Sequence, residues 1–185
     1  MPNWCSTTYA FYNASISDDE DFTRFKNEMS AFLKESLNTK SDTDRWLGTL
    51  AKHFGFDTET FPYGLRGWIT YYENCGDHFK IWVEDAWCYH NGVFELILEK
   101  YFPDVAYVLC AEEPGCEVYV NTDIDHDYLV DKYCVSIINK EEDYVEDMTY
   151  CASDDELEQL KNDWLEENPN YDFEVYEFEN DSGIY

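Results

Sequence analysis

Net charge is the feature of this sequence that most constrains its fold. The 185 residues include 41 Asp and Glu against 12 Lys and Arg, which gives a formal charge of −29 at neutral pH. Repulsion among so many carboxylates opposes a compact state, and acidic chains that stay disordered contain few aromatic residues. This chain has 16 Tyr, 12 Phe and 6 Trp. We therefore expect a folded acidic protein whose core is rich in aromatic side chains.

The negative charge also restricts the partners and the location of the protein. Phosphate backbones and anionic membranes are bound by clusters of Lys and Arg, so we expect neither direct nucleic-acid binding nor membrane binding. The longest clear apolar run, Val105 to Ala111, is much shorter than the roughly 18 residues of a membrane helix. Seven cysteines, an odd number scattered along the chain, favour reduced thiols. A cytoplasmic protein is expected.

Two segments carry the same signal for the start of a helix. Ser17 and Ser153 are each followed by Asp-Asp-Glu, a capping box in which the Ser caps the helix and the Glu reaches back to the cap. The acids also suit the positive end of the helix dipole. Apolar residues at helical spacing follow both boxes, and predict one helix over residues 18–37 and another from Asp154 to a stop before Pro169.

Two shorter helices are expected between these. The first covers residues 46–54, with Ser41 or Thr43 as its cap and Gly55 as its terminator. The second covers residues 93–101, where the apolar side chains again recur at helical spacing.

Six runs of β-branched and aromatic residues, bounded by turn-forming residues, predict strands. These runs are residues 68–72, 79–84, 105–111, 116–120, 133–138 and 172–178. Gly76-Asp77 and Pro114-Gly115 stand where hairpin turns would, so the sheet should be mainly antiparallel. The order of the elements predicts an α+β fold with helices packed on one face of the sheet.

Several short motifs resemble those of the YubB-like family, whose genes are carried by bacterial plasmids and phages. The resemblance covers roughly residues 1–135 and rests on a first strand at residues 8–12 and on these motifs: Met1-Pro2-Asn3-Trp4-Cys5, Phe22-Thr23-Arg24-Phe25, Asp85-Ala86-Trp87, Tyr101-Phe102-Pro103 and Glu112-Glu113-Pro114-Gly115. It implies a ferredoxin-like fold and residence on a mobile genetic element, and supplies no catalytic residues. We expect a ferredoxin-like core over residues 1–135, and an acidic strand-helix-strand extension over residues 136–185 packed on the same domain.

The charge is concentrated toward the C-terminal end. Residues 123–185 contain 21 acidic and 3 basic residues, whereas residues 1–122 contain 20 and 9. Many of these acids lie in or beside predicted helices and strands, where carboxylates are held at fixed spacing. The candidate partner-binding residues are Glu141, Glu142, Asp143, Glu146, Asp147, Asp154, Asp155, Glu158, Glu177 and Glu179.

A fixed array of carboxylates can imitate a nucleic-acid backbone and occupy the basic groove of a DNA- or RNA-handling protein. With the resemblance, this predicts an inhibitor of a host defence enzyme, such as a CRISPR nuclease or a restriction enzyme, in the cytoplasm of a bacterial host. The ten acids should then form one continuous stripe. The plainer alternatives are a solvated surface that keeps the protein soluble, adaptation to salt, and a protein interaction module with exposed Tyr residues.

Metal binding and catalysis have weaker signals. Asp123 to Asp127 match the first five positions of an EF-hand loop, but Tyr128 replaces the Gly at position six and Cys134 the carboxylate at position twelve. Asp123, Asp125, His126 and Asp127 could still hold Mg²⁺ in a nuclease acting on guide RNA or DNA. No phosphate loop, nucleophile elbow or paired zinc motif is present, so no cofactor and no structural metal are expected.

Two further groups are best explained by packing. Cys88 could be a nucleophile, although a small core thiol among aromatic neighbours is the better interpretation. Aromatic residues in the middle of the chain could stack nucleic-acid bases, but the basic groove that accompanies such platforms is missing, so we expect core packing. They are Trp68, Tyr71, Tyr72, Trp82, Trp87 and Tyr89.

Overall fold

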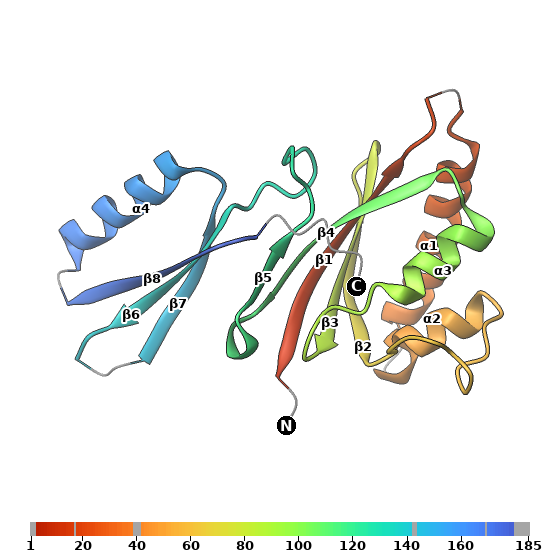
Figure 1. Cartoon of the computed structure of the whole chain (residues 1–185), viewed down its shortest axis with the longest axis horizontal. Coiled ribbons are helices and arrows are strands. Elements are labelled where there is room, and N and C mark those ends of the chain that lie inside the picture. The colour runs from red at the N-terminus through yellow and green to blue at the C-terminus, as the bar shows by residue number, and fades with distance from the viewer. Residues whose placement is uncertain (1–2, 17, 39–41, 142–143, 169, 180–185) are drawn as a thin grey trace. The chain divides into compact units, whose positions relative to one another are not determined.

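The computed structural model describes residues 3–16, 18–38, 42–141, 144–168 and 170–179. Within these residues the chain is an α+β protein with a five-stranded sheet, a three-stranded sheet and four α-helices (Figure 1). This confirms the predicted class and the antiparallel pairing. The chain divides into two compact units, residues 1–118 (unit 1) and 119–185 (unit 2). The division lies before residue 136, where the sequence placed the start of the extension.

Unit 1 has a sheet whose strand order differs from the chain order. Its elements are β1 (Trp4–Asn13), α1 (Glu20–Asn38), the 3-10 helix η1 (Asp42–Arg45), α2 (Leu47–His53), β2 (Gly67–Asn74), β3 (His78–Ala86), α3 (Gly92–Tyr101), β4 (Val105–Glu113) and the 3-10 helix η2 (Pro114–Cys116). The sheet runs β2-β3-β1-β4-β5, and β5 (Val118–Asn121) begins at the division between the units. The β2–β3 hairpin turns at Gly76, whose φ of 92° suits a glycine.

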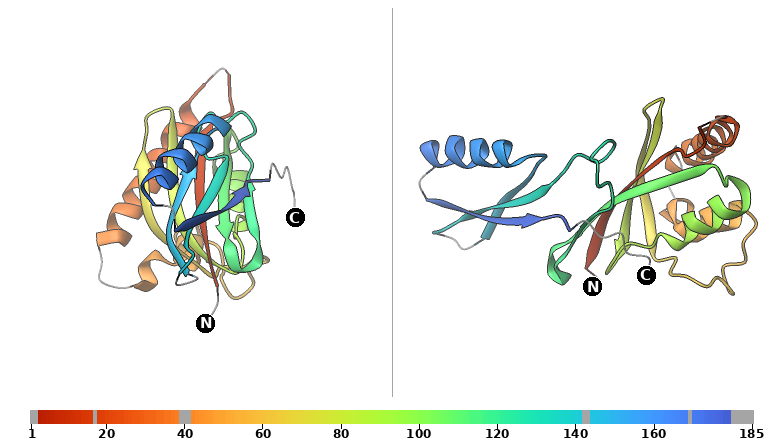
Figure 2. Two further views of the ribbon diagram at one scale, coloured as in Figure 1. Left: turned by 90° about the vertical axis from the view of Figure 1, so that its left-hand side faces the viewer. Right: turned by 45° about the horizontal axis from the view of Figure 1, so that its top comes forward.

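Aromatic residues of β1 form the centre of the unit 1 core. The ring of Phe11 lies 4.9 Å from Phe25 of α1 and 5.2 Å from Phe94 of α3. Tyr9, two residues earlier and on the same face of the strand, lies 4.6 Å from Phe94. One strand residue therefore contacts both helices, which confirms that they pack on the same face of the sheet (Figures 1 and 2).

The opposite face of this sheet carries aromatic residues that were predicted to pack in the core. Trp68 and Trp82 are half-buried and Tyr71 is 57% exposed, so these residues do not form a core. The register pairs Trp68 with Glu84, and Trp82 with Thr8, at the positions between the helix-facing residues. Strand periodicity places them together, but the sequence alone does not show that helices cover only the other face. Of the remaining predicted core aromatics, Tyr72 and Tyr89 are half-buried and Trp87 is exposed.

The ends of the helices show which capping predictions hold. Ser153 accepts a hydrogen bond from the backbone N–H of Glu156 (3.2 Å) and so caps the last helix as predicted. Gly55 ends α2 with a φ of 74°, and its N–H donates to the carbonyl of Lys52 (2.9 Å). Ser17 and Ser41 lie outside the described residues.

The predicted cap of α2 at Thr43 is wrong. The residue at the start of this helix is Trp46, which makes no side-chain cap hydrogen bond. Thr43 belongs instead to η1, where its carbonyl accepts hydrogen bonds from the N–H of Trp46 (3.4 Å) and the hydroxyl of Thr49 (2.6 Å). The 3-10 turn thus satisfies the N–H of Trp46 through a backbone carbonyl, without a capping side chain.

Unit 2 contains a three-stranded sheet with one helix on one face. Its elements after β5 are β6 (Tyr133–Asn139), β7 (Tyr144–Cys151), α4 (Asp154–Glu167) and β8 (Tyr171–Glu177), and the sheet order is β7-β6-β8. Leu157 and Leu160 of α4 pack on a cluster that includes Tyr133 and Val135 of the central strand. This helix lies along that face of the sheet (Figure 2).

Strand β7 is not predicted by the pattern of its residues. Tyr144, Val145 and Thr149 have side chains typical of strands, but Glu146 and Asp147 interrupt their alternation. In the structure Asp147 is paired with Ile137 and Val145 with Ile138 of the partner strand β6. The register therefore shifts at Glu146, which has no partner in the pairing.

One carboxyl group is buried in unit 1 beside a histidine. Asp85, near the end of β3, is fully buried, and its Oδ2 accepts a hydrogen bond from the Thr7 hydroxyl (3.1 Å). Nδ1 of His90 lies 3.6 Å from the other oxygen. A Cβ atom at Gly67, its cross-strand neighbour, would lie 2.2 Å from that oxygen, so the site requires a glycine there. Burial raises the pKa of the Asp85 carboxyl to about 7, although the hydrogen bond from Thr7 opposes this rise.

The buried Asp85 predicts a specific pH dependence of stability. Because its pKa is higher in the folded than in the unfolded chain, the folded state retains the proton, and stability is lost as the pH rises toward 7. Relative to Asp85→Asn, the wild-type free energy of unfolding should therefore fall by about 2 to 3 kcal/mol from pH 5 to 7. Urea unfolding of both proteins measures this. Asp104→Asn, at an exposed position, is the control, and parallel curves for Asp85→Asn and wild type would contradict the assignment.

Candidate functional site

Eight of the ten candidate acids lie in the described part of unit 2, and all eight are exposed. Glu142 and Asp143 lie outside the described residues. Glu146 and Asp147 are on β7, Asp154, Asp155 and Glu158 are on α4, and Glu177 ends β8, whereas Glu141 follows β6 and Glu179 follows β8. Regular structure therefore holds six of the candidate carboxylates.

The strand register places several of these acids on the side of the sheet that α4 covers. Asp147 is paired with Ile137, and Glu177 is paired with Tyr133. Ile137 and Tyr133 point to the same face as Val135, because they are separated by two or four residues. Since Val135 belongs to the cluster under α4, Asp147, Glu177 and the acids of the helix itself all lie on this side of unit 2. Glu146 has no partner in the register, but its carboxylate contacts Asn139 and Tyr171, a pair on the same face as Val135. We call Glu146, Asp147, Asp154, Asp155, Glu158 and Glu177 the α4-side acids.

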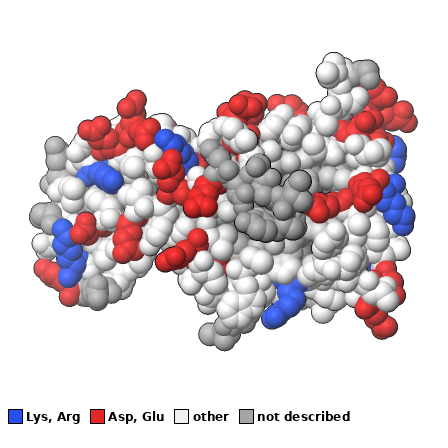
Figure 3. Space-filling model, in the orientation of Figure 1, with Lys and Arg blue, Asp and Glu red and all other residues white. Residues whose placement is uncertain are grey.

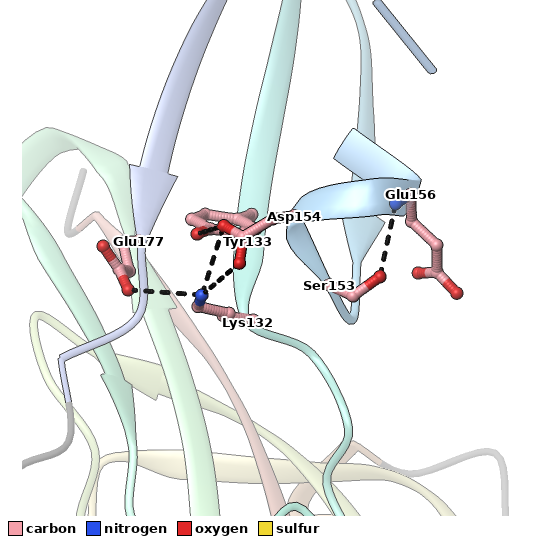
Figure 4. A network of polar contacts seen from close by, with 6 residues as sticks. All are labelled: Lys132, Tyr133, Ser153, Asp154, Glu156 and Glu177. Atoms are coloured by element: carbon pink, nitrogen blue, oxygen red, sulfur yellow. Dashed lines mark hydrogen bonds and ion pairs between the residues drawn. The ribbon is translucent and has the colours of Figure 1, made fainter. Parts of the chain in front are cut away.

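Two of the α4-side acids converge on one lysine (Figure 4). Nζ of Lys132, just before β6, lies 3.1 Å from Oδ2 of Asp154 and 3.9 Å from Oε1 of Glu177. The hydroxyl of Tyr133 donates to Oδ1 of Asp154 at 2.5 Å. These contacts connect the start of the central strand with the start of α4 and the end of β8. The sequence does not identify Lys132 as a site residue, because nothing in the spacing shows that two distant acids meet there.

The same contacts set the protonation of this network. The hydrogen bond from Tyr133, followed by the contacts with Lys132, holds the pKa of Asp154 below its usual range. In turn, the hydrogen bond to Asp154 raises the pKa of Tyr133. The pKa of Lys132 is also raised, chiefly by its hydrogen bonds with Tyr133 and Asp154. At neutral pH the network therefore holds the carboxylate of Asp154 beside the ammonium group of Lys132.

Neighbouring polar side chains contact two more candidate acids. Glu146 accepts a hydrogen bond from the hydroxyl of Tyr171 and lies 3.5 Å from Nδ2 of Asn139. Glu141 accepts from Nδ2 of Asn170 at 2.9 Å. These contacts restrict the carboxylates without removing their charge, because every donor is neutral.

The first aspartate of the acidic loop between β5 and β6 fixes the backbone of that loop. Asp123 is buried, and its Oδ2 accepts hydrogen bonds from the backbone N–H groups of Tyr128 (2.7 Å) and Leu129 (2.8 Å). His126 has a φ of 54°, and its Nδ1 lies 3.2 Å from the carbonyl of Leu129. Asp125 and Asp127 are exposed. Among the described residues, no group of three or more His, Cys, Asp or Glu side chains is placed to share a metal ion.

Cys88 contradicts the prediction of a core thiol, because it is exposed. It follows Trp87, whose φ of 76° turns the chain sharply after β3. Partial burial, followed by the nearby charge of Asp85, raises the pKa of the Cys88 thiol. A raised pKa disfavours the thiolate, so this environment does not activate a nucleophile.

Acidic side chains are visible on both units in Figure 3. On the face shown they form groups with neutral and some basic residues between them. The predicted stripe of ten acids includes two residues that the structure does not describe, and Figure 3 shows one face only, so the stripe stays a prediction.

Comparisons with protein-family models, curated proteins and solved structures find no match to this chain. They provide no support for the resemblance to the YubB-like family, which stays a prediction. Among the described helices, none is both long and apolar enough to cross a membrane.

The Lys132 network predicts a change in the titration of Asp154. In Lys132→Met the pKa of Asp154 should rise toward its ordinary value, because the ammonium group that favours the carboxylate is gone. A depressed pKa contributes stability above the unfolded-state pKa, and this is lost as the pH falls through the folded-state value. The variant should therefore be less stable than wild type at neutral pH and approach it in acid.

Carbon-detected NMR titration of the Asp154 carboxyl and urea unfolding at several pH values test this expectation. Lys140→Met is a matched control, since Nζ of Lys140 lies 4.0 Å from Asp172 and belongs to a different ion pair. An unchanged Asp154 titration in Lys132→Met would show that Lys132 does not lower this pKa.

Proposed function

We propose that this protein is an acidic nucleic-acid mimic that blocks the nucleic-acid-binding groove of a host defence enzyme. The observation that carries the proposal is the set of α4-side acids, which are exposed and held by one helix and two strands of unit 2. Only three lysines accompany 21 acids in residues 123–185. Most of the carboxylates must therefore be left for water or for a basic partner.

The spacing of these acids suits a groove that binds a phosphate backbone. Helical residues three or four apart lie about 5 to 6 Å from each other, which applies to Asp154, Asp155 and Glu158. Phosphates follow each DNA strand at about 3.4 Å of helix axis, so one helical row of carboxylates is sparser than a phosphate row. Glu146 and Asp147 on β7 and Glu177 on β8 add carboxylates in two further rows on the same side of unit 2. Because the rows are already ordered, little conformational entropy is lost on binding.

The arrangement of unit 1 supports the fold implied by the family resemblance. Without the short helices, its chain order is strand, helix, two strands, helix, strand, and β1 lies between β3 and β4 in the sheet. We propose that this is a ferredoxin-like core, as the YubB-like resemblance implies. In that setting the protein comes from a plasmid or phage, acts in the bacterial cytoplasm, and has a CRISPR nuclease or restriction enzyme as its target.

A protein interaction module that is not a mimic is the second candidate. Exposed apolar side chains on the edge strand β7 favour it, because Tyr144, Val145 and Tyr150 are 45%, 49% and 45% exposed. A metal-dependent nuclease has less support. Asp123, one of its four candidate residues, is buried and uses its carboxylate to fix the loop backbone.

Reversal of four exposed acids distinguishes a local mimic from a protein that is merely acidic. We expect Asp147, Asp155, Glu158 and Glu179, all changed to Lys, to abolish inhibition of the target and to leave circular dichroism unchanged, because solvated substitutions alter stability little. The measurement is phage or plasmid interference in cells that carry one CRISPR or restriction system at a time, followed by inhibition of the purified target.

The matched control has the same net charge but keeps the α4-side acids. Glu35, Glu59, Glu99 and Asp104 are exposed acids of unit 1, and changing them to Lys gives the same shift of charge, from −29 to −21. This variant should still inhibit. Equal loss of inhibition in both variants would mean that only total charge matters, and full inhibition by the unit 2 variant would exclude the mimic.

The mimic also predicts how binding responds to salt and to nucleic acid. Binding to the target should weaken as salt rises and should compete with the target's DNA or RNA, because both ligands use the same basic groove. Titration calorimetry at several salt concentrations, with and without the nucleic acid, measures both effects. Cleavage of DNA or guide RNA by the purified protein alone would instead establish the nuclease.

A further inference from the structure

A groove of about 400 Å³ lies on the face of the unit 1 sheet opposite the helices. The indole rings of Trp4 and Trp68 meet there at 75°, with their centroids 5.2 Å apart. Trp4 is 43% exposed although it is a large aromatic residue. The groove is lined by Trp4, Arg45, Trp68, Ile69, Thr70 and Glu84.

The pairing of three adjacent strands builds this groove. Glu84 of β3 is paired with Trp68 of β2 on one side and with Ser6 of β1 on the other. Trp4 lies two residues before Ser6 on the same face of β1. The exposed carboxylate of Glu84 is therefore next to the corner formed by the two indole rings.

Two indole rings beside a carboxylate suit a cationic ligand. A cation is attracted to the face of an aromatic ring, most strongly to that of Trp, and the carboxylate adds an ion pair. The cation–π contacts found among the described residues use Phe22, Phe56, Tyr101, Phe102 and Tyr133. No described Lys or Arg side chain lies over Trp4 or Trp68 in a contact of this kind.

Arg45 gives the groove one positive end. Its Nη2 donates a hydrogen bond of 3.5 Å to the carbonyl of Leu37, near the end of α1, which directs its guanidinium group toward that helix. A second cation is repelled there and attracted toward Glu84. The negative charge of Glu84 at the same time disfavours the phosphates of a nucleic acid that would stack on the rings.

We propose that the Trp4–Trp68 groove binds an arginine side chain of a basic protein partner. The planar guanidinium group of arginine stacks on indole and can donate two parallel hydrogen bonds to the carboxylate of Glu84, which the ammonium group of lysine cannot do. The groove thus supplies an anchor for one side chain, in a unit other than the one that carries the α4-side acids. The identity of the partner rests on the proposed function, whereas the ligand chemistry of the groove does not.

The test uses the full chain and Nα-acetyl-arginine methylamide as the probe. We expect the indole N–H signals of Trp4 and Trp68 to shift in a saturable way in ¹H–¹⁵N NMR titrations. The matched citrulline derivative has nearly the same shape without the charge and should cause little shift. Trp4→Phe and Glu84→Gln should each weaken binding of the arginine probe by about threefold or more, because each keeps the fold and removes part of the site.

Glu73→Gln is the control variant, because this exposed acid of β2 lies five residues, or roughly 17 Å, along the strand from Trp68. It should bind the probe like wild type. Equal shifts with the citrulline derivative, or unchanged binding by Glu84→Gln, would overturn the proposal. Shifts caused by a short oligothymidine and not by the arginine probe would also overturn it, and would identify the groove as a base-stacking site.

The two proposals fail in different experiments. If the groove does not bind arginine, unit 2 should still compete with nucleic acid for the target. If the groove binds arginine normally but the variant with four reversed acids still inhibits the target, the groove proposal stands and the mimic proposal is wrong.

Discussion

Repulsion among 41 carboxylates, opposed by only 12 basic residues, is the constraint on which the rest of this structure depends. The fold meets it by keeping most acids at the surface and burying aromatic rings. In unit 1, Phe11 contacts helices α1 and α3 at once, so a single strand position joins three elements. In unit 2 the buried cluster is smaller, and Tyr133 and Val135 of the central strand lie under α4. Each unit therefore offsets its own charge with apolar burial.

Two acids show what happens when a carboxyl group takes part in packing. Asp85 is enclosed, and burial raises its pKa to about 7, so the protein retains a proton there that a solvated carboxyl would lose. Asp154 stays at the surface, and Tyr133 and Lys132 lower its pKa. The first arrangement reduces the negative charge inside unit 1, and the second holds a charged carboxylate in place at the start of α4. Asp154 and the other exposed acids remain available to a partner.

The two proposed surfaces recognise the same kind of partner by different physics. The α4-side acids act through many charges at fixed spacing, which attract any basic groove and depend strongly on salt. The Trp4–Trp68 groove acts through two ring faces and one carboxylate, Glu84, which favour a planar cation. The charge of the α4-side acids attracts any basic protein. The shape of the Trp4–Trp68 groove selects among basic side chains. A protein that uses both gains affinity and selectivity from separate parts of its sequence.

Local signals in the sequence were sufficient for the class of fold and most of the elements. The cap at Ser153, the helix end at Gly55 and the hairpin at Gly76 each depend on residues close in sequence, so their physics is visible without the structure. The exposure of Trp68 and the meeting of Asp154 with Glu177 at Lys132 depend on which face the helices cover and on strand register. Strand β7 was missed because Glu146 and Asp147 break its alternation, and only pairing with β6 stabilises it. The sequence by itself determined that the chain must be folded, acidic and aromatic-rich. Only the tertiary structure decided which carboxylates and rings lie together, because those contacts join residues far apart in the chain.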